Sequence, residues 1–240
     1  MNTCVIIAEY NPFHNGHAWQ IAHARELGAK NVVVIMSGNF VERGTPALFP
    51  KQCRTAAALC CGADMVIELP CAYAVSGAEK FATSAVKLAN ALGFADSLVF
   101  GAETADIAQL IDIAQLLLTP KCDALIKGQL TEGNSYAVAR GLACEYLRPG
   151  SAEVLVQPNN ILAIEYCKAL ITTNSDLIPF AFPRMGVDHD DQKATDEFAS
   201  ASFLRGLKPE AWHGLVPTRA QIMYSAETIR GNIIDFKRFE

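Results

Sequence analysis

Two histidines three residues apart, His14 and His17, are the side chains of this 240-residue chain best suited to act on a charged ligand. They follow the apolar run 3–8, which predicts a buried strand, and a proline-containing turn; the pattern from Asn15 onward is helical. One helical turn separates the histidines, so both rings can face the same way. Free N–H groups and the positive dipole end at a helix start favour an anion, and each imidazole can donate to a phosphoryl oxygen.

The same pair has plainer interpretations. A His-x-x-His spacing is also compatible with half of a metal site or with two solvated polar residues. The position directly after the first predicted strand favours a functional site, and Gly16 inside the pair lets a ligand approach the backbone closely. This layout is typical of a site that holds the phosphates of a nucleotide and acts at the α-phosphate.

Apolar runs and helical patterns alternate along the rest of the chain. Strands are predicted at 31–36, 65–69, 97–100 and 177–182, and helices at 51–61, 78–92, 107–118, 135–146 and 160–172. We therefore expect an α/β fold, a Rossmann-like parallel sheet with helices on both faces, plus a small helical C-terminal part. Ligands of such sheets lie beyond the carboxyl ends of the strands, where His14, Ser37, Glu68 and Gly101 are predicted to meet.

Composition excludes some classes of protein. The net charge of −5 excludes a protein that coats nucleic acid through its overall charge, although a local basic patch remains compatible with RNA binding. The eight cysteines lack the spacing of a zinc site and are interpreted as free thiols of a reducing compartment. No leader-like segment and no apolar run of about 20 residues are present, so we expect a cytoplasmic protein without membrane contact.

The string Ala8-Glu9-Tyr10-Asn11-Pro12-Phe13-His14-Asn15-Gly16-His17 contains the His-x-Gly-His pattern of the nucleotidyltransferase superfamily. As a whole it resembles the bacterial tRNA(Met) cytidine acetate ligases. Five further blocks resemble that family in the same order, at residues 36–40, 43–44, 64–70, 100–103 and 158–162. The resemblance covers roughly the first 205 residues.

The resemblance implies an ATP-dependent ligase. Acetate would attack the α-phosphate of ATP, giving acetyl-adenylate and pyrophosphate, and the acetyl group would pass to N4 of the wobble cytidine of elongator tRNA(Met). Mg²⁺ is expected as the counter-ion of ATP, without a dedicated protein metal site. We expect an ATP-binding domain at 1–190 and a helical segment at 191–240 that carries a second phosphate-binding signature. Family members are longer, so the chain is expected to lack most of the C-terminal region that helps to bind tRNA.

The resemblance also implies roles for individual residues. His14, His17 and Arg205 would be catalytic. The ATP-binding residues would be Ile7, Ala8, Glu9, Tyr10, Asn11, Pro12, Phe13, His14, Asn15, Gly16, His17, Gln20, Gly101, Asn159, Asn160, Arg184 and Ser202.

Several of these residues have a structural alternative. Gly101 is also compatible with a turn glycine, and the pair Asn159-Asn160 with capping of the next helix, so which Asn contacts ATP stays open. Arg184 precedes a family-like polar segment at 187–190 and is also compatible with a surface salt bridge. Ser202 and Arg205 are also compatible with an ordinary Ser-capped helix.

Further candidates and other functions remain. Lys51 and Arg54 share one helix face and are compatible with binding an acid substrate or phosphate, while Glu9 and Glu68 suit structural roles equally well. Two other functions are compatible with the sequence: a small-molecule adenylyltransferase with a nucleotide or pantetheine phosphate acceptor, and a nucleotide-binding protein without chemistry. The sequence does not indicate the oligomeric state.

Overall fold

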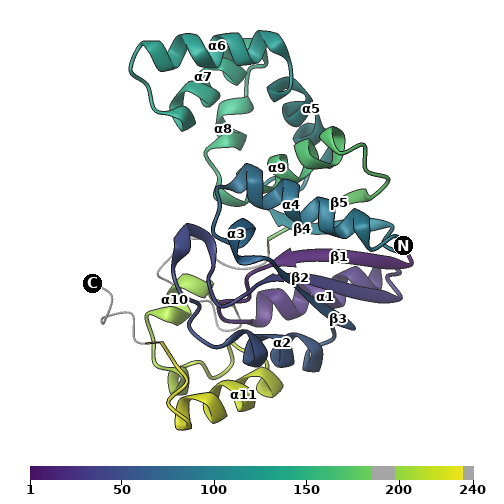
Figure 1. Ribbon diagram of the computed structural model, residues 1–240, viewed down its shortest axis with the longest axis vertical. Helices are drawn as coiled ribbons and strands as arrows, with labels where there is room; N and C mark the ends of the chain where they lie inside the picture. The colour runs from purple at the N-terminus through teal and green to yellow at the C-terminus, as the bar shows by residue number, and fades with distance from the viewer. Residues whose placement is uncertain (185–197, 235–240) are drawn as a thin grey trace.

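The structure is a computed structural model that describes residues 1–184 and 198–234 (Figure 1). Within them a single parallel sheet has the strand order β3-β2-β1-β4-β5. The strands are β1 (Thr3–Ala8), β2 (Asn31–Ser37), β3 (Met65–Leu69), β4 (Ser97–Ala102) and β5 (Ile178–Pro183). In this register Val5 lies opposite both Val33 and Leu98. The predicted parallel α/β sheet is confirmed, with strand ends within two residues of the predicted ones.

Helices cover both faces of the sheet, as predicted. The helices are α1 (Asn15–Glu26), α2 (Lys51–Cys60), α3 (Cys71–Ala74), α4 (Ala78–Ala91), α5 (Ile107–Leu117), α6 (Pro120–Thr131), α7 (Tyr136–Leu147), α8 (Ser151–Leu155), α9 (Pro158–Thr172), α10 (Ala201–Arg205) and α11 (Thr218–Ile229), with 3-10 turns at Glu42–Gly44 and Pro209–Ala211. Because strand side chains alternate, Val5 packs into one core with α4, α5 and α9, whereas Cys4 and Ile6 pack into a second core with α1, α2 and α11.

A helical lobe formed by α6, α7 and α8 projects from the sheet and connects to it through α5 and α9 (Figure 1). We predicted α7 but left the rest of 120–157 undefined. The missed helix α6 carried a sequence signal: Thr119 is its N-cap, with the hydroxyl accepting from the Cys122 N–H, and Pro120 occupies its first turn.

The C-terminal elements α10 and α11 pack into the second core, with α1 and α2. The rings of Phe49, before α2, and Tyr224, in α11, stack with centroids 4.6 Å apart, and Trp212 is fully buried beside them. The bounds of α11 were not predicted, although it lies in the segment 191–240 that we expected to be helical. The proposed domain boundary at 190 and the family-like segment 187–190 lie outside the described residues. None of the helices in the described part of the chain is long and apolar enough to cross a membrane.

Candidate active site

A cleft of about 500 Å³ lies at the carboxyl ends of β1, β4 and β5, a volume within the range of small-molecule sites. Most of the predicted ATP-binding residues line it: Ile7, Ala8, Glu9, Tyr10, Asn11, His14, Gly16, His17, Gln20, Gly101, Asn159, Arg184 and Ser202. The catalytic candidate Arg205 lines it as well. Four of the predicted residues, Pro12, Phe13, Asn15 and Asn160, are not among the lining residues.

The two histidines form a stacked pair at the start of α1. Their ring centroids are 3.8 Å apart, and the rings are inclined by 29°. His14 is the N-cap: its Nδ1 accepts from the Gly16 N–H at 3.1 Å, while Nδ1 of His17 accepts from the His14 N–H at 3.2 Å. Because each Nδ1 is an acceptor, the proton of each neutral ring is on Nε2. The pair therefore offers two Nε2–H donors to a ligand in the cleft.

The expectation of free backbone donors at the start of α1 is wrong. The Asn15 N–H donates to the Leu215 carbonyl, the Gly16 N–H to His14 Nδ1, and the His17 N–H to the His14 carbonyl. Side chains rather than helix amides thus supply the donors. Gly16 has a further structural reason: a Cβ there would lie 3.0 Å from Cε1 of His14, so a larger residue would press on that ring.

Burial keeps both histidines neutral. It lowers the pKa of His14 to about 3, with the cationic Arg184 and Arg205 adding to the effect. Burial also lowers the pKa of His17 well below its ordinary value, helped by His14. At neutral pH the pair is therefore a set of uncharged hydrogen-bond donors, and the positive charge of the cleft comes from its arginines.

We predict that this burial makes the fold sensitive to acid. Below pH 6.5 the unfolded chain protonates His14 but the folded chain does not until about pH 3, so stability is lost as the pH falls. Lowering the pH from 7 to 5 should cost about 2 kcal/mol of unfolding free energy through His14 alone. Urea unfolding at several pH values measures this. In His14→Asn, which keeps a capping oxygen, the loss should shrink by that amount; an identical pH dependence in both proteins would contradict the prediction.

Arginines from two different elements hold the cleft loops in place. Arg205 donates through Nη1 to the Asn11 carbonyl at 2.8 Å and through Nη2 to Ser202 Oγ at 2.9 Å. Arg184 donates to Oδ1 of Asn159 at 2.5 Å. Both guanidinium groups line the same cleft as the histidines, so the arrangement suits a polyanion.

The second-rank candidates Lys51 and Arg54 are absent from the lining of this cleft. Arg54 is fully buried and donates to the carbonyls of Glu9, Ser37, Gly38 and Phe49, where it ties the loops after β1 and β2 together. Lys51 pairs with Glu68 at 2.5 Å. Burial raises the pKa of Glu9, which lines the cleft and accepts from the Glu42 N–H at 2.7 Å.

The Asn pair does not cap α9, contrary to the prediction, because that helix begins at Pro158 with Gln157 as N-cap. The carboxylate of Glu103 instead accepts from the backbone N–H groups of Asn159 and Asn160, at 3.2 and 2.8 Å. Asn160 is fully buried, and its side-chain amide contacts Thr104. Its Oδ1 accepts from the Thr104 N–H, and its Nδ2 donates to the Thr104 hydroxyl. Asn159 lines the cleft, bridging Glu103 and Arg184.

We predict that Asn160 contributes mainly to stability and Asn159 mainly to ATP binding. Asn160→Ala leaves the Thr104 N–H without its acceptor and should cost about 1–3 kcal/mol of unfolding free energy. Asn159→Ala should change stability less and instead raise the KM for ATP. Thermal unfolding and ATP titration of the two variants measure this. A larger ATP effect for Asn160→Ala than for Asn159→Ala at equal folding would contradict the assignment.

The apolar wall of the cleft was not predicted. Trp19, Phe81, Phe100, Leu162, Tyr166 and Phe182 line it, together with Val41, Glu42 and Thr45 from the loop after β2. No sequence signal separates these side chains from ordinary core residues. At Gly101 a Cβ would lie 3.3 Å from Cγ of Arg184, so the glycine makes room for that arginine. In the described ranges, no cluster of three or more His, Cys, Asp or Glu side chains is arranged to hold a metal ion.

These features define a class of protein: a parallel α/β nucleotide-site fold with a His-x-Gly-His pair at its first strand–helix turn. The chain belongs to the HIGH Nucleotidyl Transferase family, whose model matches residues 1–239.

Individual members of the family are also similar to this chain. The chain is 41% identical over 211 residues to the tRNA(Met) cytidine acetate ligase of Clostridium novyi and 40% identical over 211 residues to that of Acetivibrio thermocellus. These matches cover 85% of this chain but 53% and 51% of the relatives, so the chain spans about half their length. Crystal structures of Thermotoga maritima TmcAL, apo and bound with alpha-thio ATP, match with a TM-score of 0.90 at 30% identity, covering 97% of this chain and 58% and 57% of those chains.

Proposed function

We propose that this chain binds ATP in the cleft and joins acetate to its α-phosphate, as the first half of tRNA(Met) cytidine acetate ligation. The observation that carries the proposal is the convergence of the neutral pair His14–His17 and the cations Arg184 and Arg205 on one cleft. The names of the relatives and the alpha-thio ATP bound to the Thermotoga protein support the same assignment.

In the proposed reaction an acetate oxygen attacks the α-phosphorus of ATP. The bond from that phosphorus to the bridging oxygen breaks, and its electron pair leaves with pyrophosphate. Negative charge is redistributed over the phosphate oxygens, where His14 and His17 would donate through Nε2. Arg205 and Ser202 would bind the β- and γ-phosphates. The protein contributes positioning and charge stabilisation rather than covalent chemistry.

The other end of ATP would lie along β4 and α9. Gly101 and Asn159 line that part of the cleft and would contact the adenosine, with Arg184 between them and the phosphates. The buried Asn160 would act through Glu103 and Thr104 rather than on ATP. Mg²⁺ would accompany ATP as a counter-ion bound through the phosphates.

In the second half-reaction, N4 of the wobble cytidine of elongator tRNA(Met) would attack the acetyl carbonyl carbon. AMP would leave with the electron pair of the mixed-anhydride bond, and N4 would lose a proton. The names of the relatives give a cytidine of tRNA(Met) as the acceptor, and the family resemblance implies N4 of the wobble cytidine. A tRNA acceptor would place the protein in the cytoplasm.

The test separates the proposal from the two other functions. The purified chain is incubated with labelled pyrophosphate and ATP, with acetate or with phosphate-bearing acceptors, and then with labelled acetate and total tRNA. Acetate-dependent exchange into ATP and labelled acetylcytidine are the expected results. Exchange with phosphate-bearing acceptors alone would indicate an adenylyltransferase. ATP binding without any exchange would indicate a nucleotide-binding protein without chemistry.

A further inference from the structure

A second cleft, of about 860 Å³, lies between α4 and α7. It borders the ATP cleft, because Ala78 at the start of α4 lines both. The second cleft therefore adjoins the ATP cleft and lies between α4 and the lobe helix α7, whose arrangement Figure 1 shows. Its position suits a substrate that must reach the acyl group from outside the ATP cleft.

The floor of this cleft is the polar face of α4. Lys80, Thr83, Ser84 and Lys87 follow the spacing i, i+3, i+4, i+7, which places them on one helix face, and all four line the cleft. Both lysines are exposed. Within residues 1–184 and 198–234, neither lysine forms an ion pair. The two ammonium groups are thus available to phosphates of a ligand.

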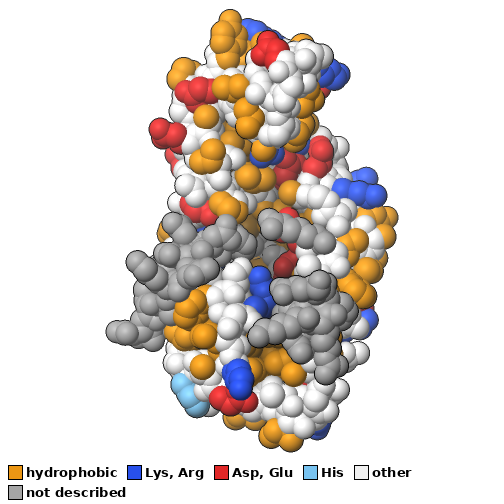
Figure 2. All heavy atoms as spheres, turned by 90° about the vertical axis from the view of Figure 1, so that its left-hand side faces the viewer, with side chains coloured by type: hydrophobic (Ala, Val, Ile, Leu, Met, Phe, Trp, Pro, Cys, Tyr) orange, Lys and Arg blue, Asp and Glu red, His pale blue; other side chains and the backbone are white. Residues whose placement is uncertain are grey.

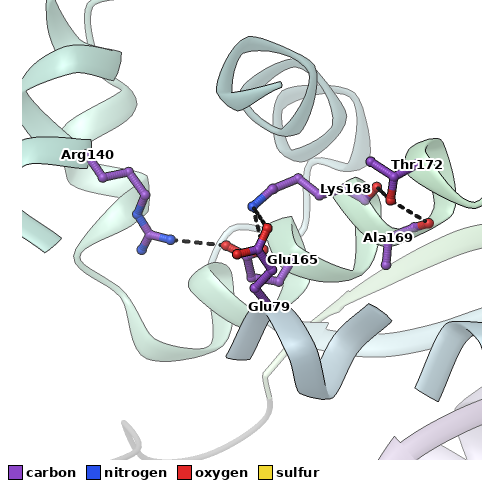
Figure 3. Close-up of polar contacts among 6 residues, drawn as sticks. All are labelled: Glu79, Arg140, Glu165, Lys168, Ala169 and Thr172. Carbon is purple, nitrogen blue, oxygen red and sulfur yellow. Dashed lines mark hydrogen bonds and ion pairs between the residues drawn. The ribbon is translucent and has the colours of Figure 1, made fainter. Parts of the chain in front are cut away.

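An ion network joins α4, α7 and α9 at one side of the cleft (Figure 3). Arg140 and Glu165 are buried in it, whereas the Glu79 side chain is 70% exposed. Arg140 of α7 donates to Glu165 Oε1 at 3.2 Å, and Lys168 of α9 contacts Glu165 Oε2 at 2.8 Å and Glu79 at 3.1 Å. These two cations and two carboxylates balance, so Lys80 and Lys87 give the cleft its net positive charge. The buried Nε of Arg140 has no hydrogen-bond partner among the described residues.

Exposed aromatic rings stand next to these cations. Tyr136 is 54% exposed, and its ring centroid lies 5.9 Å from Cζ of Arg140. Tyr73 is 40% exposed, and Nζ of Lys80 lies 6.0 Å from its centroid. Apolar side chains are also exposed on the neighbouring lobe (Figure 2). Aromatic faces for bases beside cations for the backbone are the combination that binds single-stranded nucleic acid.

We propose that the α4–α7 cleft binds an unpaired segment of the RNA acceptor, with bases against Tyr73 and Tyr136 and phosphates at Lys80 and Lys87. This inference rests on the proposed function, which requires an RNA base to reach the acetyl-adenylate. The cleft's own chemistry favours RNA over a second copy of this chain, because exposed aromatic rings beside two exposed lysines suit stacked bases and phosphates. An unpaired segment fits because its bases are free to stack.

The test measures binding of an elongator tRNA(Met) transcript to the 240-residue chain as a function of salt. In Lys80→Ala/Lys87→Ala, affinity should fall and the slope of log affinity against log salt should decrease by about 1.4, the value for two phosphate contacts on a single strand. Tyr136→Ala should weaken binding about 5- to 160-fold, the effect of one lost stack. Lys30→Ala/Lys208→Ala removes the same charge from exposed positions outside both clefts and should leave the slope unchanged.

The outcomes are separable from those of the proposed function. Wild-type affinity and salt slope in the Lys80/Lys87 variant, with circular dichroism reporting a folded protein, would overturn the inference. A change in sedimentation without a change in RNA affinity would assign the cleft to a second copy of the chain and overturn it as well. Acetate-dependent pyrophosphate exchange by the wild type, run without RNA, tests the proposed function alone. Cleft-dependent RNA binding without that exchange would support the inference while rejecting the proposed function.

Discussion

Replacing His17 by Asn is expected to reduce acetate-dependent pyrophosphate release at least about 100-fold while leaving the fold intact. The amide of Asn reaches about as far as Nδ1 of the imidazole, so it can still accept from the His14 N–H and complete the helix cap. It cannot reach the position of Nε2. The variant therefore removes the donor to the phosphates and keeps the contact that supports α1.

Two further variants of His17 distinguish the loss of the phosphate donor from the loss of the helix cap. His17→Gln places an amide N–H near the former Nε2 position and should recover part of the lost rate. His17→Ala removes both contacts and should lose at least as much activity as Asn, with some stability as well. Pyrophosphate release and thermal unfolding of all three measure this. A near-wild-type rate for either Asn or Ala would remove the pair from the mechanism.

Replacing Arg205 by Lys is expected to lower kcat/KM for ATP about 100- to 1,000-fold although the charge is kept. The guanidinium uses two nitrogens at once, one on the Asn11 carbonyl and one on Ser202 Oγ, which orients its remaining N–H groups toward the cleft. A lysine ammonium cannot hold both contacts in one plane. The loss should appear mainly in kcat if Arg205 stabilises charge in the transition state.

A matched control exists in α11. Arg219 is an exposed arginine that donates to the Cys60 carbonyl and does not line the cleft. Arg219→Lys should leave the kinetics of pyrophosphate release unchanged. Equal kinetics for Arg205→Lys and wild type would show that a simple positive charge suffices. That result would contradict the claim that the planar guanidinium of Arg205 is needed to bind the phosphates.

The fold was predictable because strand and helix signals are local. The β-branched run at 31–36 and the glycine at position 93 mark their elements without knowledge of their neighbours. The strand order β3-β2-β1-β4-β5 and the packing of α11 on α2 depend on contacts between distant segments. Such contacts leave no local pattern in the sequence, so they could not be predicted from it.

The site was predictable where chemistry and position coincided. His14 and His17 stand at a helix start and Gly101 near a strand end, and the structure brings them to one cleft with Arg205, the last residue of α10. Asn160 shows the limit: it shares the sequence pattern of Asn159 but faces Thr104 in the interior. Which of the two Asn side chains faces the cleft is decided by how the first turn of α9 is oriented against β4, and the sequence does not show that orientation.

Burial and capping were likewise not readable from the sequence. The neutral state of His14 results from desolvation in the folded protein. The first backbone N–H groups of α1 are not free for a ligand, because they donate to the Leu215 carbonyl and to His14. The fully buried Arg54 shares the apolar face of α2 with Ala57 and Ala58, but the four carbonyls that satisfy its guanidinium come from other segments of the chain. The burial of His14, the contact with Leu215 and the burial of Arg54 are tertiary effects, whereas the His14 cap is a local contact that the pattern of residue types did not reveal.

The most direct test is a crystal structure of this chain with a nonhydrolysable ATP analogue. We expect the triphosphate in the cleft at the start of α1, with Nε2 of His14 and of His17 about 2.7–3.2 Å from phosphate oxygens. A triphosphate bound elsewhere, or imidazole rings directed away from it, would contradict the central claim that this neutral pair holds the phosphates.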